Sequence, residues 1–330
     1  MRREETVPRA VDIDIRSNRK EHLSLEVSCV VDRKLTITYY LHSGFSVAME
    51  DVLLVFDYWT GEQGELPQDK RITPEFLRTF REVYVFISHE HPDHLDPVVF
   101  TWRTEVPITY IVSADMPIGT RGKRMAPGDA LTLSPRVQVK AFDSTDLGVS
   151  FLVDLAGVKV FHAGDLNFWH WREESTIKEI EEADDAFRQA VEPIAREEID
   201  VAFFPVDARQ GMMYDAGANY FMMCVKPRLL IPMHFWGRAE IATEFARRSR
   251  CRQTEVLALT RYGEQIDLHF TEDGYIDVSL LTPPEVVVSS KQNTNELPIV
   301  EVPDNRDVDL EGYDSADPFA DSDLPVKLDE

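Results

Sequence analysis

Residues 83–94 read Val-Tyr-Val-Phe-Ile-Ser-His-Glu-His-Pro-Asp-His, an apolar run followed by a cluster of polar side chains. The run predicts a buried strand, because its first five residues are all apolar. Three imidazoles and the carboxylate of Asp93 follow within six residues, in a chain that has only nine His. Neutral imidazole nitrogens and carboxylate oxygens are the ligands that Zn²⁺ and related divalent ions prefer. The stretch therefore predicts a metal site at the end of a buried strand.

Three other places repeat this arrangement of an apolar run followed by a metal-ligand type of side chain. Asp57 and His234 each come directly after such a run, and Asp165 follows another one after Gly164. Glycine allows the backbone to turn tightly there. A single His or Asp at a strand end is usually a cap, but four such places predict that the strand ends share one centre.

The charge of the chain argues against a nucleic-acid partner. The formal net charge is −24, and the last 30 residues hold eleven Asp or Glu against two basic residues. The remainder is still acidic, and such a mean field repels a polynucleotide. The compact basic cluster at 121–124 is interpreted as a solvated turn. We therefore expect a small-molecule substrate.

The cysteines and the apolar segments indicate the compartment. Cys29, Cys224 and Cys251 are odd in number and lack metal-type spacing, which favours free thiols in a reducing environment. We expect no signal peptide, because no apolar run follows the charged residues at 1–5, and no apolar stretch approaches the roughly 20 residues needed to span a bilayer. We expect a cytoplasmic protein that does not engage a membrane, with a homo-oligomer as an open alternative.

The hydrophobic pattern predicts alternating groups of strands and helices. Two runs of strands, each followed by helices, predict two mixed β-sheets with helices outside. No P-loop and no Gly-x-Gly-x-x-Gly motif after a strand is present, so a nucleotide-binding fold lacks its signature. Strands are expected at 22–31, 35–41, 52–56, 83–87, 108–112, 137–142, 149–153, 158–161, 201–204, 228–233, 255–259 and 265–269, with a Gly-containing loop between the second and third, and helices at 73–80, 171–198, 217–225 and 238–249.

Over residues 36–270 the chain resembles the metallo-β-lactamase superfamily of metal-dependent hydrolases, whose pattern is an Asp, His-x-His-x-Asp-His, a later His, a Gly-Asp and a final His. The resemblance implies an α/β (α+β) fold, a four-layer αβ/βα sandwich of two mixed β-sheets with helices outside. The phrases at 40–45, 161–165 and 232–235 are similar to the branch that includes L-ascorbate-6-phosphate lactonase and cytoplasmic Zn-dependent hydrolases. The expected domain covers 21–282, between a loosely ordered segment at 1–20 and an acidic tail at 283–330 that is too polar to fold.

The resemblance implies two divalent metal ions, with Zn²⁺ expected and Mn²⁺ or Fe²⁺ as alternatives. Asp57 is expected behind the ligands, where it accepts a ring N–H from a ligand His, with a structural strand-end cap as the alternative. Carried over by position, the first ion is held by His89 and His91, the second by Asp93, His94 and His234, and Asp165 bridges both.

One element of the family pattern is missing. No His lies between residues 95 and 161, so the His of the third motif is absent. Asp146 is the candidate replacement and Asp143 the second choice. A carboxylate is a harder ligand than an imidazole, so the first site would hold Zn²⁺ less tightly and tolerate Mn²⁺ or Fe²⁺ better. A mononuclear centre is the alternative.

Three further His lie near the motifs. His162 is expected to be buried and to hydrogen-bond a ligand carboxylate. His170 lies among aromatic residues at 167–171 and is a candidate for a pocket wall that contacts substrate or donates a proton, with simple packing of the aromatic residues as the alternative. His42 could approach the site from the first hairpin. Asp93 and His170 are the candidate catalytic residues.

The predicted function is hydrolysis of an ester, lactone, amide or phosphoester of a small molecule by a hydroxide that the metal ions activate. A phosphodiesterase or nuclease of the same fold is the alternative enzyme. A catalytically degenerate metal-binding scaffold, whose acidic tail recruits a partner, is the alternative outside enzymes.

Overall fold

The computed structural model describes residues 13–15, 33–171, 174–249, 251–271 and 276–281. The strands of its first sheet are β1 (Ile13–Ile15), β2 (Arg33–Tyr39), β3 (Phe45–Met49), β4 (Val52–Phe56), β5 (Glu82–Ile87), β6 (Thr109–Ser113), β7 (Lys123–Met125), β15 (Gln265–Phe270) and β16 (Ile276–Leu280). The second sheet contains β8 (Ala130–Ser134), β9 (Val137–Phe142), β10 (Ser150–Leu155), β11 (Val158–His162), β12 (Val201–Pro205), β13 (Leu229–Met233) and β14 (Glu255–Val256). The helices are α1 (Pro74–Leu77), α2 (Ile177–Ile194), α3 (Ala216–Cys224) and α4 (Ala239–Arg248), with 3-10 turns η1 (Gln68–Lys70), η2 (Pro97–Phe100), η3 (Trp102–Thr104) and η4 (Ala208–Met213).

Both sheets are mixed, and each contains a parallel half. Within the described residues, the first sheet has the order β1-β16-β15-β2-β3-β4-β5-β6-β7 and the second β14-β13-β12-β11-β10-β9-β8. Strands β4, β5, β6 and β7 are parallel to one another, as are β11, β12, β13 and β14. Strand β2 runs in the same direction as β4, because β3 is antiparallel to both. The loops that follow these strands therefore leave each sheet at one edge, where ligands of open α/β sheets bind.

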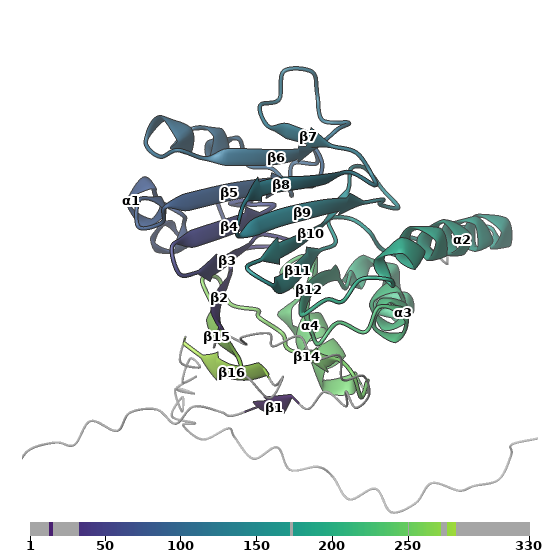
Figure 1. Cartoon of the computed structure of the whole chain (residues 1–330). Coiled ribbons are helices and arrows are strands. Elements are labelled where there is room, and N and C mark those ends of the chain that lie inside the picture. The colour runs from purple at the N-terminus through teal and green to yellow at the C-terminus, as the bar shows by residue number, and fades with distance from the viewer. Residues whose placement is uncertain (1–12, 16–32, 172–173, 250, 272–275, 282–330) are drawn as a thin grey trace, which may run out of the picture. The chain divides into compact units, whose positions relative to one another are not determined.

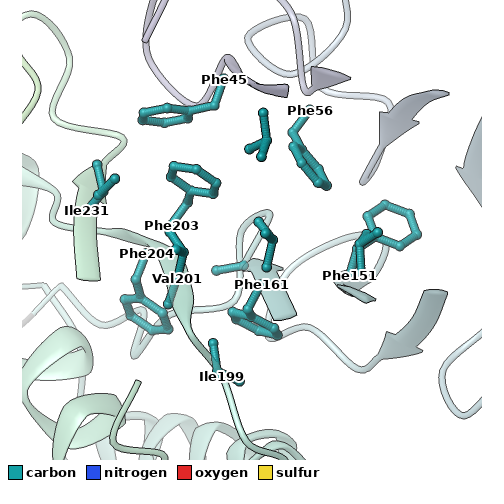
Figure 2. Close-up of a cluster of buried hydrophobic side chains, with 14 of the residues drawn as sticks. Phe45, Phe56, Phe151, Phe161, Ile199, Val201, Phe203, Phe204 and Ile231 are labelled. Atoms are coloured by element: carbon teal, nitrogen blue, oxygen red, sulfur yellow. The ribbon is translucent and has the colours of Figure 1, made fainter. Parts of the chain in front are cut away.

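Aromatic side chains fill the space between the sheets. Phe203 on β12 stacks on Phe45 of β3 with ring centroids 4.2 Å apart, whereas Phe204 stacks on Phe221 of α3 at 4.5 Å. Figure 2 shows Phe203 turned toward Phe45 and Phe56, with Phe204 turned the other way. Successive strand residues point to opposite faces, so β12 is buried between a sheet on one side and a helix on the other.

Helices cover the outer faces of both sheets, which completes four layers. Leu77 of α1, Val99 of η2 and Trp102 of η3 belong to a second apolar cluster on the outer face of the first sheet, with Val83 and Val85 of β5. Helices α2, α3 and α4 contact β9, β12 and β13 of the second sheet. In Figure 1, α1 lies beside the first sheet and these three helices lie beside the second. This is the four-layer arrangement that the sequence predicts.

Several elements differ from the sequence-based expectations. The loop expected between the second and third strands contains β3, in which Phe45, Val47 and Met49 alternate with smaller residues as in a strand, although Gly44 just before it favours a loop. The basic cluster expected to be a turn enters β7, an edge strand on which Lys123 and Arg124 are exposed. Strands β8 and β16 were not expected either. The strand expected at 255–259 is shorter, since β14 contains only Glu255 and Val256.

The helix expected at 171–198 is shorter at both ends. Helix α2 begins after Thr176, whose side chain forms a capping box with Glu179, and Pro193 lies in its last turn. A capping box fixes a helix start by satisfying two free backbone N–H groups, which explains the later start. The expected strand at 22–31 and the tail at 283–330 lie outside the described residues, whereas Ile13–Ile15, within the segment expected to be loosely ordered, pair with β16.

Two observations concern the expected free thiols and the expected lack of contact with a membrane. Cys224 and Cys251 are free thiols, and Cys29 lies outside the described residues. In the part of the chain that the structure describes, no helix combines the length and the apolar character that crossing a membrane requires.

Candidate metal centre

The predicted ligands meet at the edge where the parallel strands end. His89 to His94 follow β5, Asp165 follows β11 and His234 follows β13. Two tight contacts bring these loops together. Gly164 has φ 55°, and a Cβ on it would lie 2.8 Å from Cβ of Ser88; a Cβ on Gly148 would lie only 2.0 Å from the carbonyl oxygen of Ser88. Glycine at both positions therefore lets the loops after β11 and before β10 pack against the start of the His cluster.

The first donor group consists of His89, His91 and Asp165, whose ligand-type atoms lie within 4.8 Å of one another. Nε2 of His89 lies 2.9 Å from Nδ1 of His91. Oδ2 of Asp165 lies 3.3 Å from the first of these nitrogens and 3.7 Å from the second. His89 is fully buried, whereas the His91 side chain is 38% exposed. The group is therefore open to solvent on the His91 side.

The second donor group consists of His42, Asp93, His94 and His234, again within 4.8 Å of one another. Oδ2 of Asp93 lies 3.9 Å from Nε2 of His94, 3.8 Å from Nε2 of His234 and 3.0 Å from Nε2 of His42. The three imidazoles are buried, and the Asp93 side chain is 16% exposed. This group is thus more enclosed than the first.

Asp165 joins the two groups through its two carboxylate oxygens. Oδ2 faces the first group, whereas Oδ1 lies 2.9 Å from Nε2 of His94 and 3.3 Å from Nε2 of His234. Its backbone oxygen accepts a hydrogen bond of 2.7 Å from Nε1 of Trp169, which fixes the loop. The carboxylate therefore lies where the bridging role predicted from the sequence requires it.

Residues behind the donors set the tautomers of the ligand rings. Nδ1 of His94 donates to Oδ2 of Asp57 at 2.8 Å, the ring N–H contact that the sequence predicts for Asp57. Ser88 donates from both its backbone N–H and its hydroxyl to Asp57, and its Oγ lies 2.9 Å from Nδ1 of His89. Nδ1 of His234 donates to Oδ2 of Asp207 at 3.0 Å. These contacts leave Nε2 of His89, His94 and His234 with the lone pair that a metal ion needs.

The charges of the metal-free centre attract a cation. Burial alone would raise the pKa of Asp165, but His94 and His234 hold it well below its usual value. The reverse effect raises the pKa of His94 well above its usual value, because Asp165 and Asp57 outweigh its burial. For His42, burial and the nearby His234 lower the pKa to about 3, so its imidazole is neutral. A divalent ion would take the place of the protons that the buried carboxylates attract.

Buried atoms without partners provide a test of the fit to metal ions. Among the described residues, Nε2 of His94, Oδ1 of Asp165 and both ring nitrogens of His42 are buried and make no hydrogen bond. Buried polar atoms are normally paired, and an imidazole nitrogen 2.9 Å from a carboxylate oxygen is unfavourable unless a proton or a metal ion lies between them. The donor set of imidazoles and carboxylates therefore fits two divalent ions.

Asp146 and His162 are placed differently from the expectations. Asp146 is exposed and lies near enough to His91 to help raise the pKa of that imidazole, but it belongs to neither donor group. The partner predicted for His162 is wrong, because Nε2 donates to the backbone oxygen of Ser43 at 2.9 Å and Nδ1 accepts from the N–H of Gly164 at 3.2 Å. Both of its nitrogens are thus used by the backbone, and Asp57 is the nearest carboxylate, at 3.7 Å.

The structure does not support His170 as part of a pocket wall. Its side chain is buried and stacks on Phe168 with ring centroids 4.3 Å apart, and its Nδ1 lies 3.2 Å from the oxygen of that residue. The neighbouring Trp169 and Trp171 line the cavity beside the donors, whereas His170 does not. Packing of the aromatic segment, the alternative considered for the sequence, accounts for this residue.

Two residues of the centre, His42 and Asp207, are not among the ligands and ligand-orienting residues that the sequence predicts. His42 follows β2 with φ 56°, and Asp207 follows β12. Both obey the rule that found the other residues, a polar side chain just beyond an apolar strand. The sequence predicts only that His42 approaches the site, and it assigns Asp207 no role, because the apolar strand before it is typical of the core.

A cavity of about 530 Å³ opens beside both donor groups. Its wall includes three tryptophans and one cation, Arg209, whose Cζ lies 4.6 Å from the ring centroid of Trp236 and 5.8 Å from that of Trp171. A larger hollow of about 720 Å³ lies between β2, β3 and α1, but none of its residues belongs to a donor group. The cavity is lined by His91, Pro92, Asp93, Thr145, Asp146, Asp165, Trp169, Trp171, Arg209, His234 and Trp236.

Comparisons with known proteins agree with this geometry. Residues 36–234 match the family model described as "Beta-lactamase superfamily domain", which is more than half of the chain. A UPF0173 metal-dependent hydrolase of Archaeoglobus fulgidus is 26% identical over 61% of this chain and 83% of the relative. Another, of Opitutus terrae, is 25% identical over 71% of this chain and 100% of the relative.

The fold is also found among solved structures. Igni18, a metallo hydrolase from Ignicoccus hospitalis, superimposes with a TM-score of 0.54 at 19% identity, over 72% of this chain and all of that one. At this identity the likeness concerns the fold alone. The family model matches the segment that carries both donor groups, and this match shows the family. The chain belongs to the metallo-β-lactamase superfamily of metal-dependent hydrolases.

Proposed function

We propose that the protein hydrolyses an ester, lactone, amide or phosphoester bond of a small molecule that carries an anionic group next to an apolar one. The observation that carries this proposal is the pair of donor groups joined by the two oxygens of Asp165, directly beside a cavity. When bound there, two divalent ions would lower the pKa of water toward ~7 and polarise the substrate oxygen. We take Zn²⁺ as the ion, with Mn²⁺ or Fe²⁺ as alternatives, and the cytoplasm as the compartment.

The side chains of this chain would then position the groups that react. Asp165 and Asp93 both reach the cavity, and Asp93 Oδ2 is the carboxylate oxygen of the second donor group. We assign Asp93 the task of orienting the reacting water as a hydrogen-bond acceptor, because the nearby His42 and His94 outweigh its burial and hold its pKa well below the usual value, so that the carboxylate stays ionised. Trp169, Trp171 and Trp236 exclude water from the apolar part of the substrate.

Arg209 supports the anionic part of the substrate. Its Nε and Nη2 donate to the buried Asp207, and among the described residues no partner is found for Nη1. The side chain is 49% exposed, and its plane is held against Trp236 and Trp171. A guanidinium fixed in this way presents a donor to a carboxylate or phosphate at a defined position. The acidic charge of the chain, −24, argues for a small substrate rather than a polynucleotide.

A turnover screen tests the proposal. The metal-loaded protein is assayed with lactones, esters and amides that carry a carboxylate or phosphate, with their neutral analogues, and with bis-p-nitrophenyl phosphate. We expect turnover of an anionic substrate, and Arg209→Lys should raise its KM by about 10-fold while the neutral analogue is unaffected. Activity on the phosphodiester alone would favour a phosphodiesterase of the same fold. No turnover of any substrate by protein that holds two ions would favour a metal-binding scaffold.

A further inference from the structure

His42 lies in the second donor group although it is far from the other ligands in the sequence. It follows β2, and its backbone is tied to the site at two points. The His42 N–H donates to the hydroxyl of Tyr39 at 3.1 Å, and its carbonyl oxygen accepts from the N–H of His234 at 3.3 Å. Its left-handed backbone, with φ 56°, is costly for a residue with a Cβ and indicates that the surroundings hold it in place.

The ring of His42 faces the donors of the second group. Its centroid lies 4.0 Å from that of His234 and 5.6 Å from that of His94. Its Nε2 lies 3.0 Å from Oδ2 of Asp93, yet both ring nitrogens are buried and, within the described residues, make no hydrogen bond. A close approach of nitrogen and oxygen without an aligned hydrogen bond is what a shared cation would explain.

Simple packing does not explain this position as well. Trp236 and Trp59 contact the ring, at centroid distances of 4.5 and 5.8 Å. An imidazole that serves only as packing would still cost free energy if it left two buried nitrogens unpaired. His162 illustrates the structural alternative in the same centre, because both of its nitrogens are paired with the backbone.

The distances between donors agree with one ion. Ligand atoms about 2.1 Å from a Zn²⁺ ion lie roughly 3.0–3.4 Å apart in four- or five-coordinate sites. Three pairs around the second group approach this range: His42 and Asp93 at 3.0 Å, His94 and Asp165 at 2.9 Å, and His234 and Asp165 at 3.3 Å. Asp93 lies further from His94 and His234, at 3.9 and 3.8 Å, and would have to move slightly toward them on binding. The group offers four donors of its own and Oδ1 of Asp165, whereas the first group offers two imidazoles and Oδ2.

We propose that His42 is a ligand of the second ion and that the second donor group fills before the first. The proposal rests on the metal centre of the proposed function. It reverses the expectation from the family pattern, in which the first ion has three imidazoles of its own. Here the imidazole missing from the first group is matched by an additional one in the second, so affinity shifts toward the more enclosed group.

A metal titration with matched variants tests this proposal. Metal-free protein is titrated with Co²⁺ and with Zn²⁺, and the affinity of each equivalent is measured by equilibrium dialysis with metal analysis. His42→Gln should weaken the first equivalent by about 10–100-fold, whereas His91→Gln should leave the first equivalent unchanged and weaken the second. The melting temperature of each metal-free variant, compared with that of the metal-free wild type, controls for folding.

X-ray absorption on the wild type with one equivalent of Zn²⁺ needs no variant. Scattering from three imidazoles is expected if the single equivalent occupies the second donor group with His42, His94 and His234 as ligands, and two imidazoles would overturn the proposal. An unchanged first equivalent in His42→Gln would overturn it as well, and so would loss of the first equivalent in His91→Gln. A wild type that binds no ion would instead contradict the metal centre itself, which keeps the two failures distinct.

Discussion

The two donor groups share Asp165 and one edge of the sandwich, but they are assembled differently. The first takes His89 and His91 from a single loop, only two residues apart, and His91 is partly exposed. The second takes its donors from the loops after β2, β5 and β13, and its imidazoles are buried. Donors on several strands are held by the packing of both sheets, whereas donors on one loop depend on that loop. The motif that is easiest to see in the sequence therefore supplies both imidazoles of the first group but only Asp93 and His94 of the second, which gains His42 and His234 from other loops.

Backbone conformation shows the same contrast. Left-handed φ values occur at His42 and His234 of the second group and at Asp57, which orients His94. Each costs on the order of 1–2 kcal/mol and persists only where the surrounding structure fixes it. Neither His89 nor His91 has a left-handed φ, and the left-handed Asp57 reaches the first group only indirectly, through Ser88, which contacts His89. The fold thus constrains the second group more tightly.

The largest expected effect comes from substituting Asp165, the residue that the two donor groups share. Asp165→Asn keeps the size of the side chain but removes the charge that both groups use, so each group would lose the carboxylate oxygen that would help to hold its ion. We expect turnover to fall by about 10³-fold or more, and both metal equivalents to weaken. Metal analysis after dialysis, together with kcat for the best substrate, measures this. Loss of only one equivalent would show that Asp165 serves a single ion.

Substitutions of Asp57 and Asp207, which hydrogen-bond ligand imidazoles, should distinguish the two groups. Asp57→Asn disturbs His94 directly and His89 through Ser88, so it should weaken both equivalents by about 10–100-fold. Asp207→Asn also loosens Arg209, but His234 is the one metal-ligand candidate that it contacts, so it should weaken only the equivalent bound by the second group. The two variants are compared in the same Co²⁺ titration. Equal losses on both equivalents in Asp207→Asn would contradict the division into two groups.

The sequence predicted the part of this centre that obeys a local rule. An apolar strand followed by Asp or His identified Asp57, the cluster after β5, Asp165 and His234, and the periodicity identified the four layers. It did not include β3, because Gly44 favours a loop there, although Phe45, Val47 and Met49 alternate with smaller residues as in a strand.

The pairing of distant loops could not be predicted, because it depends on how the sheets pack. His42 becomes a neighbour of Asp93 only once β2 lies in the same sheet as β4 and β5. The roles of His162 and His170 were misjudged for a related reason, since sequence distance to Asp165 does not say which way a ring points. Three-dimensional contacts, with Ser43 and Phe168, decide both.

The smallest expected effect concerns Asp146, the predicted replacement for the missing imidazole. Its carboxylate faces the cavity from an exposed position and helps raise the pKa of His91, but it lies outside the first donor group. Asp146→Ala should therefore weaken the ion of the first group only through lost attraction between charges, by less than about 10-fold. Asp143→Ala is the matched control, because that residue is also exposed on the same loop but does not line the cavity. A loss of 100-fold or more in Asp146→Ala alone would mean that the loop closes on the ion and that Asp146 completes the first group. The contrast between a complete and an incomplete group would then disappear, leaving only the difference in burial between them.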